Sequence, residues 1–348
     1  MSTIRDIAKL ANVSIATVSR VLNNDSKYKM TEETKQRVLN AAKQLNYNLD
    51  AIKRKKSSGP KSNKPLKAKI GCILRVTKKG YNDPYYMAVL AGVEEQLREA
   101  GIDLAFIKSG PVLHDKSVLN SIFNEPLDGL ILMDPLNDNI YNFIKKRVRH
   151  IVGIDTLRND IDDVGYDHLQ NGILATQHLI DKGHTEIGFI GGSGESGDIR
   201  DSQRYQGYII AMHKAGLPVN EEWVIDCRWY EDECIEKIDR LCKSNHLPTA
   251  FFAASDLMAM AAMKSFYMNG IAVPERVAVI GMSNIEMSQY SNPPLTTVNQ
   301  PIHKIGTEAA NMLLDMIASK KNKPRNILLQ ENDLIIRESV INRNNYKI

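Results

Sequence analysis

Residues 3–47 carry hydrophobic side chains at the three- and four-residue spacing of short amphipathic helices. Thr3 and Asp6 resemble a capping box at the start of IRDIAKLA, and Ser14 is a favourable N-cap for SIATVSRVLNN. Asn12, between these two segments, tolerates the left-handed backbone that a tight turn requires. A third helix is predicted behind the first two. Its expected buried face is Val38, Leu39, Ala42 and Leu45.

Two helices joined by a tight turn, with a third packed behind them, follow the helix-turn-helix plan. In that plan the second helix enters the major groove of DNA with its first residues near the base edges. The spacing alone is equally compatible with a generic three-helix bundle, so the choice depends on residue identity.

From residue 69 onward the pattern changes to short apolar runs separated by helix-length amphipathic segments. Such runs predict parallel strands of a doubly wound α/β fold, and their number predicts two lobes rather than one small sheet. In such folds, ligands bind outside the carboxyl ends of the strands. The runs are KIGCILRV, IDLAFIKSG, LDGLILMDP, HIVGIDT, TEIGFIGGS, TAFFAASD and VAVIGMSN, followed by the two-strand pattern NILLQENDLIIRESV.

Composition adds a charge asymmetry to this picture. Residues 1–69 hold 16 Lys or Arg and 5 Asp or Glu, whereas the rest of the 348-residue chain holds 29 basic and 36 acidic residues. A small basic segment before a large acidic body predicts a nucleic-acid-binding end. The four cysteines form no C-x-x-C pair, and neither a secretory signal nor an 18-residue apolar run is present. We therefore expect a cytoplasmic location, free thiols and no membrane partner.

The segment IRDIAKLANVSIATVSRVLN resembles the start of the lactose/galactose repressor (LacI/GalR) family of bacterial transcription regulators. Asp6-Ile7-Ala8, Val13-Ser14, Thr17-Val18-Ser19-Arg20 and Leu22-Asn23 match its pattern, and Asn12 replaces the usual glycine. The resemblance implies an N-terminal all-α helix-turn-helix domain and a periplasmic-binding-protein-like α/β core with parallel sheets, whose two lobes close on a small ligand.

The expected domains are a DNA-binding domain over residues 1–48, a basic hinge or linker over residues 49–68 and a two-lobed effector-binding and dimerisation core over residues 69–340. The first lobe is expected to comprise about 69–160 and 300–325. The second is expected to comprise about 161–295 and 326–340, with NPPLTTVNQP in the hinge region between the lobes.

The resemblance also assigns roles to residues of the second helix. Ile15 and Ala16 occupy the variable base-reading pair, where they can offer only apolar contacts to thymine methyl groups. Arg20 can donate two hydrogen bonds to a guanine edge. Contacts to phosphates, which position the helix without specifying sequence, are expected from Ser14, Thr17 and Ser19. The complete DNA-binding set is Ser14, Ile15, Ala16, Thr17, Ser19, Arg20, Asn23, Lys53, Arg54, Lys55 and Lys56.

The linker departs from the family pattern, which places a minor-groove hinge helix with a leucine wedge after the first domain. Here the wedge position falls on a lysine near Lys56, and SSGPKSNKP would break a longer helix. Ile52 is the only nearby apolar candidate for a wedge. We therefore expect the basic residues to contact phosphates, with weaker bending of DNA.

Polar strand ends predict the effector site. Arg204 lies in RYQGY, where the family has an arginine that reaches into the cleft, and a guanidinium suits vicinal diols or carboxylates. Ser255 and Ser283 stand where the family commonly has Asn and Asp, which leaves the identity of the ligand open. A neutral, hydroxylated ligand such as a sugar is expected. The complete effector-binding set is Tyr85, Tyr86, Asp155, Arg204, Ser255, Asp256, Ser283 and Asn284.

A literal G-x-G-x-x-G at residues 192–197 could alternatively indicate a dinucleotide site. It lies in the middle of the chain and lacks a suitably placed ribose-binding acid, so no cofactor is expected. The histidines lack metal-ligand spacing, and no metal site is expected. No nucleophile–base–acid constellation indicates an enzyme.

The predicted function is a ligand-responsive transcriptional regulator, specifically a repressor of carbohydrate-utilisation genes. Its predicted partners are double-stranded operator DNA with a pseudo-palindromic sequence, a sugar-like small-molecule effector and a second copy of the chain in a homodimer. The alternatives are an α/β enzyme or a plain sugar-binding protein, each with an appended DNA-binding domain.

Overall fold

The computed structural model describes residues 4–22, 31–44, 68–74, 83–133, 136–193, 197–244, 246–319, 325–329 and 332–343. The chain divides into two compact units, Met1–Lys64 and Pro65–Ile348, and each is described by itself. None of the helices in the described ranges is long and apolar enough to cross a membrane.

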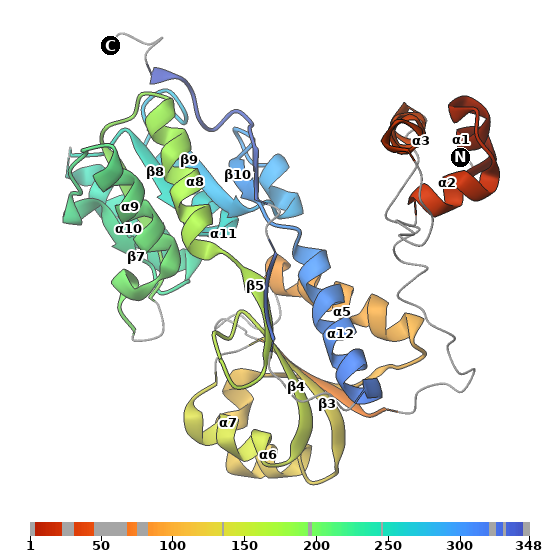
Figure 1. The fold of residues 1–348 in the computed structure, drawn as a ribbon. Helices are drawn as coiled ribbons and strands as arrows, with labels where there is room; N and C mark the ends of the chain where they lie inside the picture. The colour runs from red at the N-terminus through yellow and green to blue at the C-terminus, as the bar shows by residue number, and fades with distance from the viewer. Residues whose placement is uncertain are drawn as a thin grey trace. The chain divides into compact units, whose positions relative to one another are not determined.

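The first unit consists of three short helices (Figure 1): α1 (Ile4–Ala11), α2 (Ile15–Leu22) and α3 (Glu32–Gln44). Asn12 adopts the expected left-handed conformation, with φ of 50°, and the Val13 amide donates to the Ala8 carbonyl at 3.0 Å. Leu39 is 40% exposed, so the expected buried face of α3 is wrong at this position. The buried side chains are Ile7, Ala8, Ala11, Val18, Val38, Ala41 and Ala42.

The second unit contains two six-stranded sheets (Figure 1). The first has the strand order β11-β5-β4-β3-β1-β2, and all its neighbouring strands pair in parallel. Its strands are β1 (Ile70–Leu74), β2 (Leu104–Ser109), β3 (Leu127–Leu132), β4 (Val148–Ile154), β5 (Asp162–Tyr166) and β11 (Asn326–Leu329). Its helices are α5 (Pro84–Glu99), η1 (Gly110–His114), α6 (Lys116–Ile122), α7 (Asp138–Lys145) and α12 (Ile302–Ser319).

The second sheet has the order β12-β10-β9-β8-β6-β7, and only β12 runs antiparallel to its neighbour. Its strands are β6 (Ile187–Gly191), β7 (Val224–Asp226), β8 (Ala250–Ala253), β9 (Ala278–Ser283), β10 (Thr296–Asn299) and β12 (Asp333–Ile335). Its helices are α8 (His168–Asp181), η2 (Ile199–Asp201), α9 (Gln203–Lys214), η3 (Glu221–Trp223), α10 (Glu231–Lys243), α11 (Asp256–Met268) and η4 (Glu286–Gln289).

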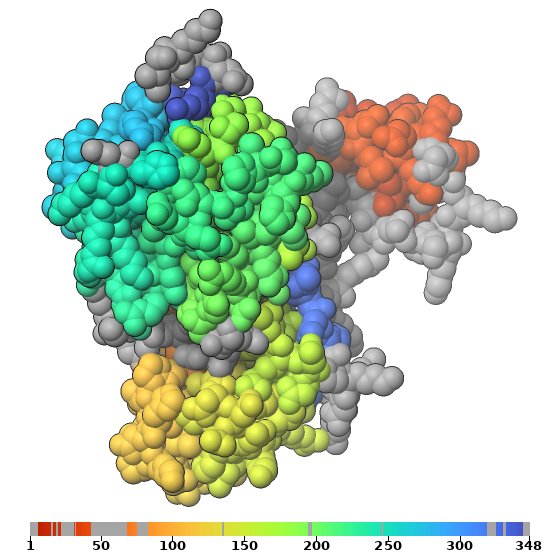
Figure 2. All heavy atoms as spheres, turned by 90° about the vertical axis from the view of Figure 1, so that its left-hand side faces the viewer, coloured from red at the N-terminus to blue at the C-terminus, as the bar shows by residue number. Residues whose placement is uncertain are grey.

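Helices cover both faces of each sheet, because successive side chains of a strand point to opposite faces. In β8, Phe251 belongs to the core beneath α10 and α11, whereas Phe252 belongs to the core beneath α8 and α9. In β1, Cys72 faces α5 and α12, whereas Ile73 faces α6 and α7. This confirms the predicted doubly wound α/β core. The two lobes are visible as separate bodies in Figure 2, yellow and green to cyan.

The chain passes between the lobes three times: from β5 to α8, from β10 to α12 and from β11 to β12. The expected lobe boundaries therefore need correction at two places. Residues 162–166 form β5 and residues 326–329 form β11, and both strands belong to the first sheet, not the second. Sequence pattern could not assign them, because β5 (DDVGY) has little apolar character and β11 pairs with it across about 160 residues of chain.

Close backbone contact between α5 and α12 fixes one face of the first lobe. A Cβ atom added at Gly306 would lie 2.0 Å from the Val89 carbonyl oxygen, and one added at Gly92 would lie 2.1 Å from the His303 carbonyl oxygen. Only glycine at both positions allows the helices to approach this closely, side by side along the lobe (Figure 1).

We expect Gly306→Ala to lower the free energy of unfolding by about 1–3 kcal/mol, because the new methyl group overpacks against backbone. Urea unfolding monitored by circular dichroism measures the change. Glu308→Ala, in the same helix, is the control for altered helix propensity. Equal stability of Gly306→Ala and the control would contradict the packing interpretation.

Candidate functional site

The turn and second helix of the first unit have the local geometry expected of a helix-turn-helix. The Ser14 hydroxyl caps α2, accepting from the Thr17 amide at 3.0 Å and lying 2.9 Å from the Thr17 hydroxyl. Arg20 is partly exposed in the last turn of α2. Ile15, Ala16 and Ser19 lie in α2, but their side chains are outside the described part of the structure. The remaining predicted DNA-binding residues, Asn23, Lys53, Arg54, Lys55 and Lys56, and the wedge candidate Ile52 also lie outside it.

Two adjoining cavities lie at the carboxyl ends of the strands of both lobes. Their volumes are about 170 Å³ and about 110 Å³, and both are lined by Tyr85, Tyr86, Arg204 and Trp229, so they form two parts of one cleft. The two tyrosine rings meet edge to face at the start of α5, with centroids 5.2 Å apart. Of the predicted effector-binding residues, those lining the cleft are Tyr85, Tyr86, Asp155, Arg204, Ser255, Asp256 and Ser283.

Protein donors already contact both carboxylate oxygens of Asp155, directly after β4. Oδ2 accepts from the Tyr85 hydroxyl at 3.2 Å, and Oδ1 lies 3.2 Å from His168 Nε2 and 3.3 Å from the Tyr166 amide nitrogen. Burial alone would raise the pKa of Asp155, but its interaction with His168, the charge of Arg204 and the hydrogen bond from the Tyr166 amide outweigh burial and hold this pKa below its ordinary value. Asp155 is therefore an anion that joins the first lobe to the first residue of α8.

His168 is a cleft residue that the sequence did not reveal. Its side chain is 11% exposed and lines the larger cavity, and its Nδ1 atom is buried without a hydrogen-bond partner among the described residues. A lone histidine at a helix start has no distinguishing pattern. His168 reaches the cleft because the fold brings the start of α8 beside Asp155 at the end of β4.

Asp256 is the corresponding carboxylate of the second lobe, three residues beyond the end of β8 and the first residue of α11. Its Oδ1 accepts from the Thr297 hydroxyl at 2.6 Å and its Oδ2 from the Ile285 amide at 2.8 Å. Ser255 caps α11 by accepting from the Met258 amide at 3.2 Å. Although Asp256 lines the smaller cavity, its carboxylate mainly holds the loop after β9 against β10.

The two predicted residues at the end of β9 have different positions. Ser283 lines the smaller cavity, and its hydroxyl donates to Gln300 at 3.3 Å. Asn284 lines neither cavity. Its amide side chain donates to Asn299 at 2.9 Å and accepts from Arg337 at 2.8 Å, so it is part of the framework behind the cleft.

Trp229 explains the glycine-rich segment that follows β6. A Cβ atom at Gly192 would lie 2.4 Å from the Trp229 ring, whose Nε1 donates to the Ser193 carbonyl at 3.2 Å. The guanidinium carbon of Arg204 lies 5.3 Å from the centroid of the same ring. Gly192 thus makes room for an aromatic wall of the cleft. The sequence did not indicate Trp229, since it lies in a short irregular segment between β7 and α10.

The described ranges contain no group of three or more His, Cys, Asp or Glu side chains arranged to hold a metal ion. All four cysteines are free, and three of them are buried.

Comparison with known proteins gives a consistent result for the whole chain. Residues 3–49 match the model described as bacterial regulatory proteins, lacI family, and residues 176–340 match the periplasmic binding protein-like domain. The HTH-type transcriptional repressor PurR of Actinobacillus pleuropneumoniae serotype 5b (strain L20) is 33% identical over 352 residues, covering 99% of this chain and 100% of the relative. The chain belongs to the lacI family of bacterial regulatory proteins.

Solved lacI-family structures agree with this assignment. A transcriptional regulator CelR–cellobiose complex has a TM-score of 0.70 and 27% identity, covering 97% of this chain and all of that one. A Lac repressor dimer bound to operator and the anti-inducer ONPF has a TM-score of 0.68 at 22% identity, covering 98% and 99%, and shows the same fold. The interpretation as a DNA-binding transcription regulator is confirmed, and the enzyme alternative is not supported.

In this lacI-family core, Asp256 links stability to pH. Burial raises the pKa of Asp256 from its ordinary value of 3.8 to about 6. The folded protein then keeps a proton that the unfolded chain releases, so the stabilisation is complete below about pH 4 and is lost as the pH rises to about 6. We expect the stability advantage of the wild type over Asp256→Asn to shrink by up to about 3 kcal/mol between pH 4 and pH 7.

Urea unfolding across that pH range measures this difference, and Asp103→Asn, at an exposed position, is the control. Asp163, whose pKa burial also raises to about 6, titrates in both proteins and cancels from the comparison. A difference that does not change with pH would contradict the prediction.

Proposed function

We propose that this protein is a transcriptional repressor whose affinity for its operator changes when a small hydroxylated ligand, sugar-like in chemistry, binds between the two lobes of the core. The observation that carries the proposal is the cleft, where a guanidinium, an aromatic wall and polar strand ends converge on one space. Arg204 supplies fixed donors for hydroxyl groups, and Trp229 and Tyr85 supply faces on which the C–H surface of a ring can pack.

The proposed domain roles follow the two compact units. Residues 1–48 read DNA, residues 49–68 link them to the core, and residues 69–340 bind the effector and a second copy of the chain. A homodimer would present two second helices to successive major grooves of a pseudo-palindromic operator. Ligand-driven closure of the lobes would then change operator affinity, typically by about 1–3 kcal/mol or roughly 5–150-fold.

Charge and ring chemistry favour a neutral ligand. Asp155 and Asp201 offset the charge of Arg204 in the larger cavity, and Glu231 and Asp83 line the smaller one, so neither cavity has an excess of arginine or lysine for an anion. A planar purine base is the competing ligand class, because three aromatic side chains line both cavities. A thermal-shift screen distinguishes the sugar class from the purine class.

A thermal-shift screen of the full chain with D-ribose, cellobiose and adenine tests the ligand class. A ligand that binds the folded protein should raise Tm in proportion to the logarithm of its concentration above Kd. We expect a sugar to do so, and Arg204→Ala to weaken its binding at least tenfold by removing charged hydrogen bonds.

Arg200→Ala is the matched control, since Arg200 is an exposed arginine of the same lobe that pairs with Glu221 and lines neither cavity. A shift with adenine alone would replace the sugar by a purine base. Equal weakening by the two arginine variants would refute the assigned cleft role of Arg204.

DNA binding is tested on operator fragments by fluorescence anisotropy. Deleting residues 1–60 should abolish binding while the effector still raises Tm, because the core holds its own hydrophobic clusters.

Arg20→Ala should weaken the free energy of operator binding by about 1–3 kcal/mol and relax the sequence preference at one base pair. The logarithm of affinity should fall with salt by about 0.9 per neutralised phosphate.

Lys264→Ala, an exposed charge change in the core, is the control for net charge. Operator affinity that does not depend on salt, or that survives the deletion, would rule out the first unit as the DNA reader.

A further inference from the structure

The turn that follows β4 carries an unusual residue at the edge of the cleft. Leu157 has a φ of 57°, a left-handed conformation that leucine rarely adopts, and Asp155 two residues earlier has a φ of 52°. Leu157 is also 51% exposed, yet it lines the larger cavity together with Trp229 and Tyr85. The strained backbone and the exposed apolar side chain of Leu157 each lower the stability of the folded protein.

The residues on either side of Leu157 hold the turn in this shape. Thr156 is buried, with its hydroxyl donating to Asp163 at 2.6 Å and its amide donating to the same oxygen at 3.2 Å. Asp155 is held by the contacts with Tyr85 and His168 described above. The strain at Leu157 therefore persists because its neighbours are bound on both sides.

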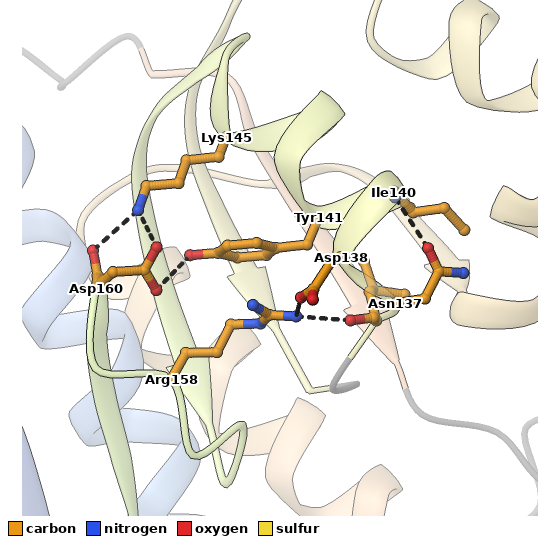
Figure 3. A network of polar contacts seen from close by, with 8 residues as sticks. Asn137, Asp138, Ile140, Tyr141, Lys145, Arg158 and Asp160 are labelled. Atoms are coloured by element: carbon orange, nitrogen blue, oxygen red, sulfur yellow. Dashed lines mark hydrogen bonds and ion pairs between the residues drawn. The ribbon is translucent and has the colours of Figure 1, made fainter. Parts of the chain in front are cut away.

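Arg158 completes this restraint from the other side (Figure 3). Its guanidinium donates to the Leu136 carbonyl at 2.7 Å, lies 3.2 Å from Asp138 and stacks over the Tyr141 ring at 3.6 Å. The Tyr141 hydroxyl donates to Asp160 at 2.9 Å, and Lys145 pairs with the same carboxylate. The turn is thus tied to the segment after β3 and to α7.

The backbone of Leu157 hydrogen-bonds to Asp163 and so helps to hold the turn, but its side chain has no such role. Its neighbours bury their side chains or bond to the protein, whereas its own side chain projects at the mouth of a cavity that also contains Met133 and Ile154. Glycine or asparagine would fit the left-handed backbone with less strain. A leucine there is explained by contact with something that occupies the cavity.

We infer that Leu157 is a specificity-determining residue that packs against the apolar face of the ligand and selects ring compounds with one C–H-rich side. The inference rests on the proposed function, because it assigns a role within the same cleft. The ligand would lie between Leu157 and the aromatic wall of Trp229. Its polar groups would face Arg204 and the strand ends, so a ligand polar over its whole surface would bind poorly.

Leu157→Asn in the full-length protein tests the inference with two measurements. The free variant should unfold about 2 °C higher than the wild type, because asparagine tolerates the left-handed conformation. Titration followed by tryptophan fluorescence should show about tenfold weaker binding of whichever of D-ribose, cellobiose or adenine binds the wild type, because an apolar contact is lost. Val112→Asn, an exposed apolar residue of the same lobe outside both cavities, is the matched control.

A lower Tm for Leu157→Asn overturns the inference without any ligand, because it would give Leu157 a structural role. A higher Tm with unchanged affinity also overturns it, because the side chain would not touch the ligand. If none of the three compounds binds the wild type, the proposed ligand classes fail. The Tm comparison still decides whether Leu157 is strained, and a rise supports its selection for a ligand outside those classes.

Discussion

The buried carboxylate of Asp155 is the interaction on which the cleft depends. Its partners come from three segments: the Tyr85 hydroxyl at the start of α5, the backbone at the end of β5 and the His168 ring at the start of α8. One anion thereby joins Tyr85 of the first lobe to α8, the first helix of the second. Its loss would leave buried donors without an acceptor, which costs more than the net value of the hydrogen bonds themselves.

Each lobe repeats the same arrangement with different electrostatics. In both, a carboxylate follows a central strand, and a glycine on the next strand makes room for it: an added Cβ at Gly165 would lie 2.3 Å from Asp155, and one at Gly281 would lie 2.3 Å from Asp256. Its neighbours hold the pKa of Asp155 below the ordinary value, whereas at Asp256 burial outweighs the hydrogen bonds and the Arg337 charge and raises the pKa. Asp155 therefore holds its proton less firmly than Asp256 does.

The sequence predicted most of the fold because its signals were local. The cap at Ser14, the turn at Asn12 and the alternating apolar runs each depend on a few neighbouring residues. It failed where assignment needed distant partners, as with β11, which pairs with β5. Leu39 was misplaced because helical spacing cannot distinguish the edge of a buried face from its centre.

The candidate site was predictable only in part, for the same reason. Strand ends are visible in the sequence, and seven of the eight predicted residues line the cleft. Asn284 instead bonds to Arg337, which lies in the sequence beyond the last strand. Trp229, His168 and Leu157 were missed because no local pattern distinguishes a tryptophan after a strand, a histidine at a helix start or a leucine in a turn from ordinary surface residues.

The position of β11 has a consequence for the order in which the chain can fold during synthesis. The first sheet contains β1 to β5 from the early part of the chain, but its edge strand is residues 326–329 and its covering helix α12 is residues 302–319. Most of the second lobe is complete by residue 299, when one face of the first lobe still lacks its helix. The lobe that emerges first from the ribosome thus remains incomplete until nearly all of the second lobe has been synthesised. Until then the surface of α5 around Val89 and Val93 lacks its α12 neighbour, and exposed apolar surface of this kind makes folding intermediates prone to aggregate.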